Sequence, residues 1–245
     1  MVASLDCPSR RLLIGAGAVL AAGVGLSGCG KASGPPAILA TEALAWGHGL
    51  LRRITTLFRE AAPNVRINPG ALDFQALAQA ARLFRAFGED YQEKALEEER
   101  VFPAVQKAGG DPAALLSTLV LQHQRGREII DYIAAKCAGG VIGAADAEPL
   151  ARTMESLARM YDEHTAVEET VIFPAWRRTM SEKQLHDASE EFAKLEQARF
   201  KGGFDQALAE VKQLEQRAGL VHLHLFTAPP PSSDAPAPVK EQPRR

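Results

Sequence analysis

One stretch is the most informative about the fold of this 245-residue chain: His164-Thr-Ala-Val-Glu168-Glu-Thr-Val-Ile-Phe173-Pro174. On a helix, a His and a Glu four residues apart lie one above the other on the same face. An imidazole and a carboxylate that point at one place are ligands for iron, manganese or zinc. The stretch therefore predicts a helix that carries part of a metal site.

A related stretch occurs earlier in the chain, as Glu93-Lys-Ala-Leu-Glu97-Glu-Glu-Arg-Val-Phe102-Pro103. Both stretches contain Glu-Glu, then three residues, then Phe-Pro-Ala, at an offset of 71 residues. A single His-x-x-x-Glu pattern is a weak signal. Two related copies argue against chance and indicate an internal repeat.

The repeat extends to the helix that precedes each copy. The pattern Leu44-x-x-x-His48-x-x-x-Arg52-x-Ile recurs as Leu119-x-x-x-His123-x-x-x-Arg-x-Ile, at an offset of 75 residues. Each half of the chain thus supplies a His on one helix and carboxylates on the next. Short connections make neighbouring helices antiparallel, so four inward-facing helices can bring these groups together in the core of a bundle.

Sustained strand alternation is missing from the sequence, which predicts an all-α fold. Pro63 and Pro69-Gly70 are expected to break the first helix, and Asp111-Pro112 is expected to cap and open the third. The pattern Ser181-x-x-Gln184 resembles a capping box. The predicted helices span about 39–60, 73–100 or a little beyond, 111–136, 148–178, 181–200 and 204–216. We expect an up-down four-helix bundle over residues 39–180 and a C-terminal helical extension over 181–227.

Both ends of the chain differ in composition from the middle. Arg10-Arg11 precede a short apolar run that ends at Leu26-Ser-Gly-Cys29. A basic start and a short apolar core predict a secretory signal, with twin arginines that resemble an export motif and a last segment that resembles a bacterial lipobox. A generic signal peptide with an incidental Cys is the alternative. We expect a signal peptide over 1–28, lipidation of Cys29, a tether over 29–38 and a disordered Pro-rich tail over 228–245.

Several functional classes are disfavoured. A net charge of −2 without a basic patch argues against nucleic acid as a partner. The sequence contains no Gly-x-Ser-x-Gly, Cys-x-x-Cys or phosphate-loop motif, which argues against a hydrolase or nucleotide enzyme. Cys137 would be the one Cys left for the folded part, so an internal disulfide framework is excluded.

With these repeats, residues 39–180 resemble the hemerythrin-like, or HHE cation-binding, family of four-helix non-haem di-iron proteins. The segment after Ser181 resembles an extension found in some bacterial members. In that family each half supplies a His and then a His-x-x-x-Glu, and the Glu carboxylates bridge two irons. Carried over position by position, the resemblance implies the metal ligands His48, Glu97, His123, His164 and Glu168.

The chain departs from the family pattern at one ligand. Glu93 stands where the first half should carry its second His, and a register one residue earlier gives Gln92. Glu93 is therefore a sixth candidate ligand, although a charged helix face explains it equally well. Arg127 replaces a His that oxygen-carrying members have on the third helix. Such oxygen-rich ligation favours Fe(III) or manganese and resembles ferritin-type sites more than an oxygen carrier.

The sequence thus predicts an extracytoplasmic lipoprotein, in the periplasm or at the cell surface, anchored to a membrane and holding non-haem iron. A di-iron site is expected, and manganese or a single metal stays open. The first functional hypothesis is binding or sensing of O2, NO or iron. The alternatives are an oxidoreductase that consumes peroxide or O2, and a metal-free interaction scaffold; whether the protein is an enzyme is left open.

Overall fold

The computed structural model describes residues 38–220 and 225–229. The predicted signal peptide, the predicted lipidation site Cys29 and almost all of the predicted tether and tail lie outside this range. Within it, no helix combines the length and the apolar character that a membrane crossing requires.

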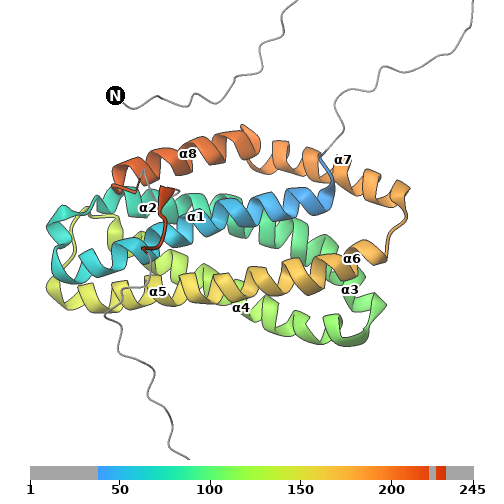
Figure 1. Cartoon of the computed structure of the whole chain (residues 1–245), viewed down its shortest axis with the longest axis horizontal. Coiled ribbons are helices and arrows are strands. Elements are labelled where there is room, and N and C mark those ends of the chain that lie inside the picture. The colour runs from blue at the N-terminus through green and yellow to red at the C-terminus, as the bar shows by residue number, and fades with distance from the viewer. Residues whose placement is uncertain (1–37, 221–224, 230–245) are drawn as a thin grey trace, which may run out of the picture. The chain divides into compact units, whose positions relative to one another are not determined.

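The described residues form helices and no strand, which confirms the all-α prediction. The elements are α1 (Ala40–Ile67), η1 (Pro69–Ala71), α2 (Phe74–Leu83), η2 (Phe84–Val101), α3 (Phe102–Ala108), α4 (Gly110–Cys137), α5 (Ala144–Val167), η3 (Glu168–Ile172), α6 (Phe173–Arg178), α7 (Glu182–Arg199) and α8 (Gly203–Arg217). The long helical segments of the bundle are α1, α2–η2–α3, α4 and α5–η3–α6, and their course can be followed in Figure 1. Helix α1 packs along α5 and α2 packs along α4, while α7 and α8 cover α1.

Three predicted boundaries are wrong. Helix α1 continues through Pro63 to Ile67, because its last turns bury Val65 and pair Arg66 with two carboxylates of α5. Tertiary packing there outweighs the helix-breaking effect of one proline. Helix α4 begins one residue before Asp111, which does not cap it, and α5 begins at Ala144 rather than near 148.

The C-terminal extension completes the bundle. The predicted capping box is confirmed: Ser181 Oγ accepts a hydrogen bond from the Gln184 N–H, and Gln184 Oε1 accepts one from the Ser181 N–H. Such a cap stabilises a helix by about 1 kcal/mol. Ser189 of α7 in turn accepts the N–H of Ala40 at 2.9 Å, at the start of α1. The extension thereby satisfies a backbone donor that the bundle alone would leave buried.

Two segments are π-helical, with hydrogen bonds from N–H to the carbonyl five residues earlier. Both end directly before a Phe-Pro pair, and the N–H groups of Phe102 and Phe173 reach back to the carbonyls of Glu97 and Glu168. A proline ring clashes with the carbonyl four residues earlier in a regular α-helix. The wider π-turn relieves this clash, so the repeated proline gives a physical reason for the repeated winding.

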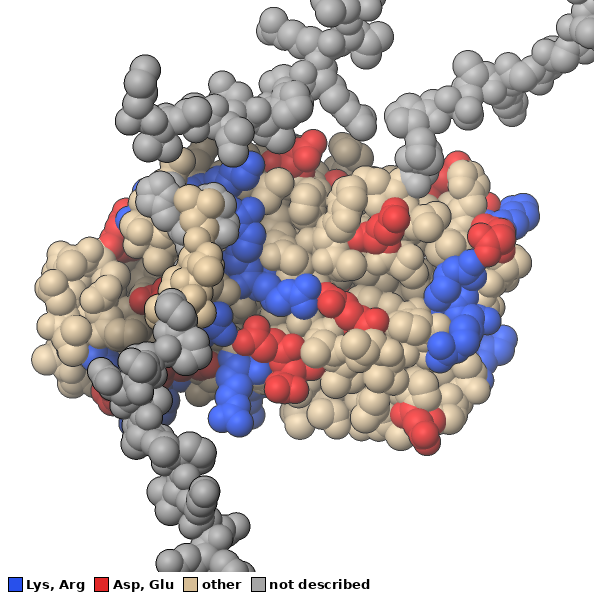
Figure 2. All heavy atoms as spheres, in the orientation of Figure 1, with Lys and Arg blue, Asp and Glu red and all other residues tan. Residues whose placement is uncertain are grey.

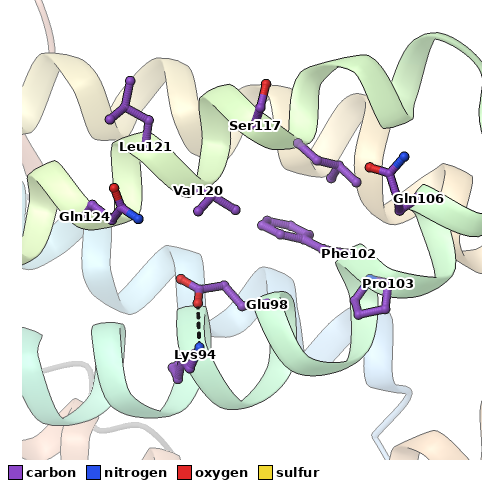
Figure 3. Close-up of a pocket in the computed structure, with 10 residues that line it drawn as sticks. Lys94, Glu98, Phe102, Pro103, Gln106, Ser117, Val120, Leu121 and Gln124 are labelled. Carbon is purple, nitrogen blue, oxygen red and sulfur yellow. Dashed lines mark hydrogen bonds and ion pairs between the residues drawn. The ribbon is translucent and has the colours of Figure 1, made fainter.

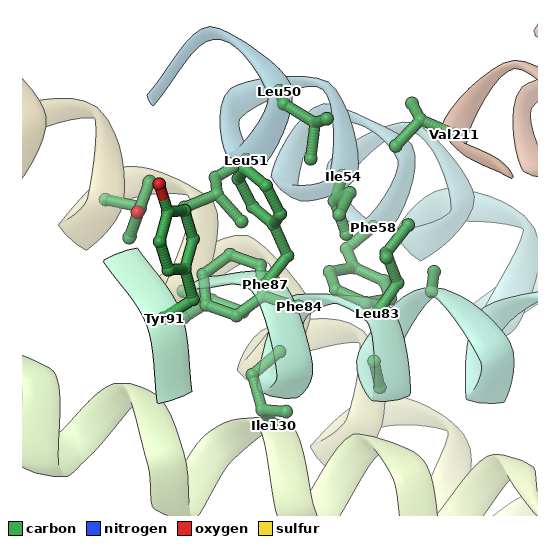
Figure 4. Packing of buried hydrophobic residues seen from close by; sticks show 14 of the residues in the cluster. Leu50, Leu51, Ile54, Phe58, Leu83, Phe84, Phe87, Tyr91, Ile130 and Val211 are labelled. Carbon is green, nitrogen blue, oxygen red and sulfur yellow. The ribbon is translucent and has the colours of Figure 1, made fainter. Parts of the chain in front are cut away.

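The core between α1 and η2 is aromatic and aliphatic (Figure 4). Its residues include Leu50, Leu51, Ile54, Phe58, Leu83, Phe84, Phe87, Tyr91 and Ile130. Burial of each such side chain is worth about 1.5–3 kcal/mol. Cys137 is also buried. This packing holds η2, and therefore Glu97, at a fixed height along the bundle.

The outer surface carries both signs of charge. On the face in Figure 2, basic and acidic side chains lie next to one another. Pairs of opposite charge join helices: Arg59 of α1 pairs with Asp162 of α5 at 3.0 Å, and the half-buried Arg53 pairs with Glu215 of α8. An exposed pair such as Arg59–Asp162 contributes about 0–1 kcal/mol, so it orients the helices more than it stabilises them.

Candidate metal centre

Three imidazoles and two carboxylates meet in the middle of the bundle. They are His48 of α1, Glu97 of η2, His123 of α4, His164 of α5 and Glu168 of η3, and all five are buried. The Nε2 atoms of His123 and His164 lie 3.1 Å apart. Ligand atoms of Glu97, His123, His164 and Glu168 all lie within 4.8 Å of one another. The four long helices thus each contribute to one cluster.

The two carboxylates connect the imidazoles. The Oε1 atom of Glu97 lies 3.2 Å from His48 Nε2, and its Oε2 atom lies 3.4 Å from His123 Nε2. The Oε2 atom of Glu168 lies 3.3 Å from His48 Nε2 and 3.1 Å from His164 Nε2. Each carboxylate therefore faces imidazoles from both halves of the chain, which is the arrangement that lets a carboxylate bridge two ions.

The cluster fits a metal ion on the chemistry of its donors. Glu97 Oε2 and both oxygens of Glu168 are buried without a hydrogen-bond partner. Unpaired buried carboxylates cost several kcal/mol unless a positive charge compensates them. Three imidazole nitrogens point at the same space, and a mixed nitrogen and oxygen donor set suits iron, manganese or zinc.

Protons compete for these groups when no metal is bound. Burial lowers the pKa of His48, but the nearby carboxylates of Glu168, Glu169 and Glu97 outweigh it and raise this pKa well above its usual value. Burial also lowers the pKa of His123, but the carboxylates around it outweigh burial and raise this pKa well above its usual value. Metal binding at such a cluster releases protons, because the ligands must be deprotonated.

Outer partners fix which nitrogen of each imidazole faces the cluster. His48 Nδ1 lies 3.1 Å from Glu169 Oε1, and His123 Nδ1 lies 3.0 Å from Glu98 Oε1. His164 Nδ1 lies 2.9 Å from the side-chain oxygen of Gln122. An acceptor at Nδ1 places the proton there and leaves Nε2 free for a metal.

Two arginines hold the outer carboxylates. Arg52 pairs with Glu169 at 2.9 Å, and Arg127 pairs with Glu98 at 2.7 Å. Sequence reasoning assigned no role to either arginine. The signal was present in the His-x-x-x-Arg part of the repeat, because residues four apart share a helix face. His48 and His123 are each held by a Glu from the other half of the chain, so neither half forms its site alone.

Glu93 and Gln92 take different positions. Glu93 is buried, its nearest basic partner is Arg127 at 3.7 Å, and its carboxylate forms no ion pair with any of the three imidazoles of the described cluster. Burial raises the pKa of Glu93 to about 8. The Nε2 atom of Gln92, in contrast, donates a hydrogen bond to Glu97 Oε1 at 2.8 Å. The structure therefore brings Gln92, and not Glu93, to the candidate ligand Glu97.

Tyr161 is a site residue that sequence reasoning missed. Its ring stacks on His164, with centroids 5.6 Å apart, and stands edge-on to His48 at 6.4 Å. The phenol is buried and its hydroxyl has no hydrogen-bond partner. Tyr161 precedes His164 by three residues, and that spacing on one helix face could have indicated it.

Two surface pockets flank the cluster at equivalent positions of the repeat. Figure 3 shows one of about 590 Å³, between the helices that carry Glu98 and Val120. The other, of about 340 Å³, is lined by Ala45, Glu169 and Phe173 among others. The ring of Phe102 stacks on His123 with centroids 5.6 Å apart. These pockets give solvent and small molecules access to the outer carboxylates, while the Phe rings cover the imidazoles.

The fold and the cluster define a helical-bundle protein with a metal-binding core. The family model of the hemerythrin HHE cation-binding domain matches residues 40–176, and the chain belongs to this family. The chain is 35% identical over 192 residues to the uncharacterized proteins Rv1995 of Mycobacterium tuberculosis and Mb2018 of Mycobacterium bovis, covering 78% of this chain and 74% of each relative. No solved structure matches the chain.

Proposed function

We propose that the protein binds non-haem iron, as two ions, at the cluster around Glu97 and Glu168 and uses it to bind or sense O2, NO or iron itself. The observation that carries the proposal is the meeting of three Nε2 atoms with two buried carboxylates, of which Glu97 Oε2 and both oxygens of Glu168 lack a hydrogen-bond partner. Iron, when bound, supplies open positions for a diatomic ligand and one-electron chemistry.

The residues of the chain determine what can reach the centre. Phe102 and Phe173 pack against His123 and His48, at centroid distances of 5.6 and 5.2 Å. Rings in contact with the imidazoles restrict the approach to molecules of a few atoms. The outer carboxylates Glu98 and Glu169 line the two surface pockets together with these rings and hold the Nδ1 protons. The site thus favours small ligands over an organic substrate.

A second candidate function is the consumption of peroxide or O2, and Tyr161 favours it. Its unpartnered hydroxyl lies near Glu93, Glu97 and Glu168, whose charges, after burial, raise the pKa of this phenol well above its usual value. A neutral phenol next to the cluster can donate a hydrogen bond to a small bound ligand. Such a donor would stabilise a bound small ligand whether or not that ligand reacts, so only a measurement of peroxide or O2 turnover separates the two functions.

The metal content and the ultraviolet–visible spectrum of the purified full chain test the proposal. We expect about two irons per chain, with charge-transfer bands that change on addition of NO or O2. Multiple turnovers of peroxide with an added reductant would favour the oxidoreductase. Protein that takes up no iron, manganese or zinc would contradict the proposal and favour the interaction scaffold.

We further infer that the protein is exported and held at a membrane by lipid on Cys29. The twin arginines, the short apolar run and the Leu-Ser-Gly-Cys sequence support this inference. We expect the wild-type protein in the membrane fraction and the Cys29→Ser variant in the soluble extracytoplasmic fraction. A wild-type chain that stays in the cytoplasm would overturn the inference without affecting the iron site.

A further inference from the structure

The two halves of the cluster differ in helical winding at the point where the sequence departs from the repeat. In the second half, His164 lies on α5, and its Nε2 atom contacts Glu168, four residues later, at 3.1 Å. In the first half, the π-helix η2 runs from Phe84 to Val101. A π-helix has a wider turn than an α-helix, with hydrogen bonds between residues five apart, so side chains four and five positions before Glu97 both lie near it. Of these two, Gln92 is the one whose side chain contacts Glu97, at 2.8 Å.

The surroundings of Gln92 complete the difference. The residue corresponding to Gly47 in the second half is Gln122, 75 positions later, which holds His164 Nδ1. At Gly47 there is no side chain, and a Cβ atom would lie 2.2 Å from Gln92 Oε1. Gln92 is fully buried there, with Nε2 also donating to the Leu44 carbonyl at 3.3 Å and Oε1 without a partner. One glutamine in the first half thus fills the space that a histidine and its outer glutamine occupy in the second.

We propose that Gln92, and not Glu93, takes the place of the missing imidazole, and that the cluster is asymmetric as a result. One side has two imidazoles, His123 and His164. The other has His48 and the Gln92 amide, which positions Glu97 through its hydrogen bond. An amide is a weaker ligand than an imidazole for first-row transition metals. The side at His48 therefore binds its metal more weakly, and metals are taken up in two distinct steps.

The unpartnered amide oxygen supports this assignment. A buried polar atom without a partner is rare and calls for an explanation. Rotation of the Gln92 amide exchanges its oxygen and nitrogen, and this brings an oxygen next to Glu97 when a cation lies there. Without a cation, the nitrogen faces Glu97, as observed. The Gln92 amide can thus donate to Glu97 when no cation is bound and turn its oxygen toward a bound cation. The space over Gly47 accommodates this rotation.

The test compares two matched variants, Gln92→His and Glu93→His, with the wild-type chain. Zinc, as a redox-silent probe, and anaerobic iron(II) are titrated by calorimetry. This inference rests on the proposed iron site, so the wild-type protein is measured first. We expect one tight and one weaker step in the wild type. Gln92→His should strengthen the weaker step by about tenfold or more, the size of effect typical of one residue that orients a metal ligand. Glu93→His should leave the weaker step unchanged.

Further variants keep the result interpretable. Gln92→Ala should weaken the same step by about tenfold, because Glu97 loses its donor. The double variant Gly47→Gln/Gln92→His rebuilds the arrangement of His164 and Gln122, and should bring the two steps together. Circular dichroism verifies that each variant stays helical.

Each outcome separates the two proposals. A wild-type chain that binds neither metal would overturn the proposed function itself. Two equal steps in the wild type, strengthening by Glu93→His rather than Gln92→His, or no change in any of these variants would overturn the assignment of Gln92 and leave the iron site in place.

Discussion

The Glu168→Gln variant is expected to lose iron from both sides of the cluster. The Oε2 atom of Glu168 lies within 3.3 Å of His48 Nε2 and at 3.1 Å from His164 Nε2, so one carboxylate serves imidazoles of both halves. Gln has nearly the same shape but no charge, and its amide nitrogen cannot bind a metal. Because substitution of an outer partner costs roughly 10- to 100-fold in metal affinity, loss of this central carboxylate should cost more than 100-fold. Competition with a chelator of known affinity measures the loss.

Two matched substitutions provide reference iron affinities for this result. Glu163→Gln changes an exposed residue on the same helix and should leave iron affinity unchanged. Glu169→Gln removes the partner of His48 Nδ1 and should give an intermediate loss, within the range for outer partners. If Glu168→Gln bound iron as tightly as Glu163→Gln, the cluster would not be the iron site.

Replacement of Glu93 by Gln is expected to stabilise the metal-free protein at pH 8 relative to pH 5. Burial raises the pKa of Glu93 to about 8, from 4.5 for an exposed Glu. A carboxyl whose pKa is raised by folding contributes stability below the unfolded pKa and loses it as the pH rises through the folded pKa. Gln stays neutral throughout, so the advantage of the variant should grow between pH 4.5 and pH 8, by on the order of 4 kcal/mol.

Urea unfolding of both metal-free proteins at pH 5 and pH 8 measures this difference. The raised pKa of His48 affects both chains, so it cancels when the variant is compared with the wild type at each pH. The charge of Glu93 itself raises the pKa of His123, so the comparison also includes a lower His123 pKa in the variant. Glu99→Gln, on the exposed side of the same π-helix, should show no growth with pH. An equal effect of Glu93→Gln at both pH values would show that this carboxyl titrates normally in the folded chain.

Local patterns in the sequence were sufficient to predict the class of fold and the kinds of candidate metal ligand. Helix periodicity, caps and the spacing of His and Glu depend on residues a few positions apart, and each has a direct physical cause. The repeat relates His48 to His123 and Glu97 to Glu168 from the sequence alone. The capping box at Ser181 followed from the same short-range rules.

Other features of the site could not be predicted from the sequence, because they depend on contacts between distant residues and on a change of helical winding. Glu169 holds His48 from 121 residues away, and Ser189 caps the start of α1 from 149 residues away. No local pattern contains such pairings, because packing of whole helices creates them. In the π-helix before Phe102, Gln92 contacts Glu97 from five positions earlier. The spacing of four that identified His164 and Glu168 selects Glu93 in the first half, whereas in the wider turn that the packed bundle adopts the contact with Glu97 comes from Gln92.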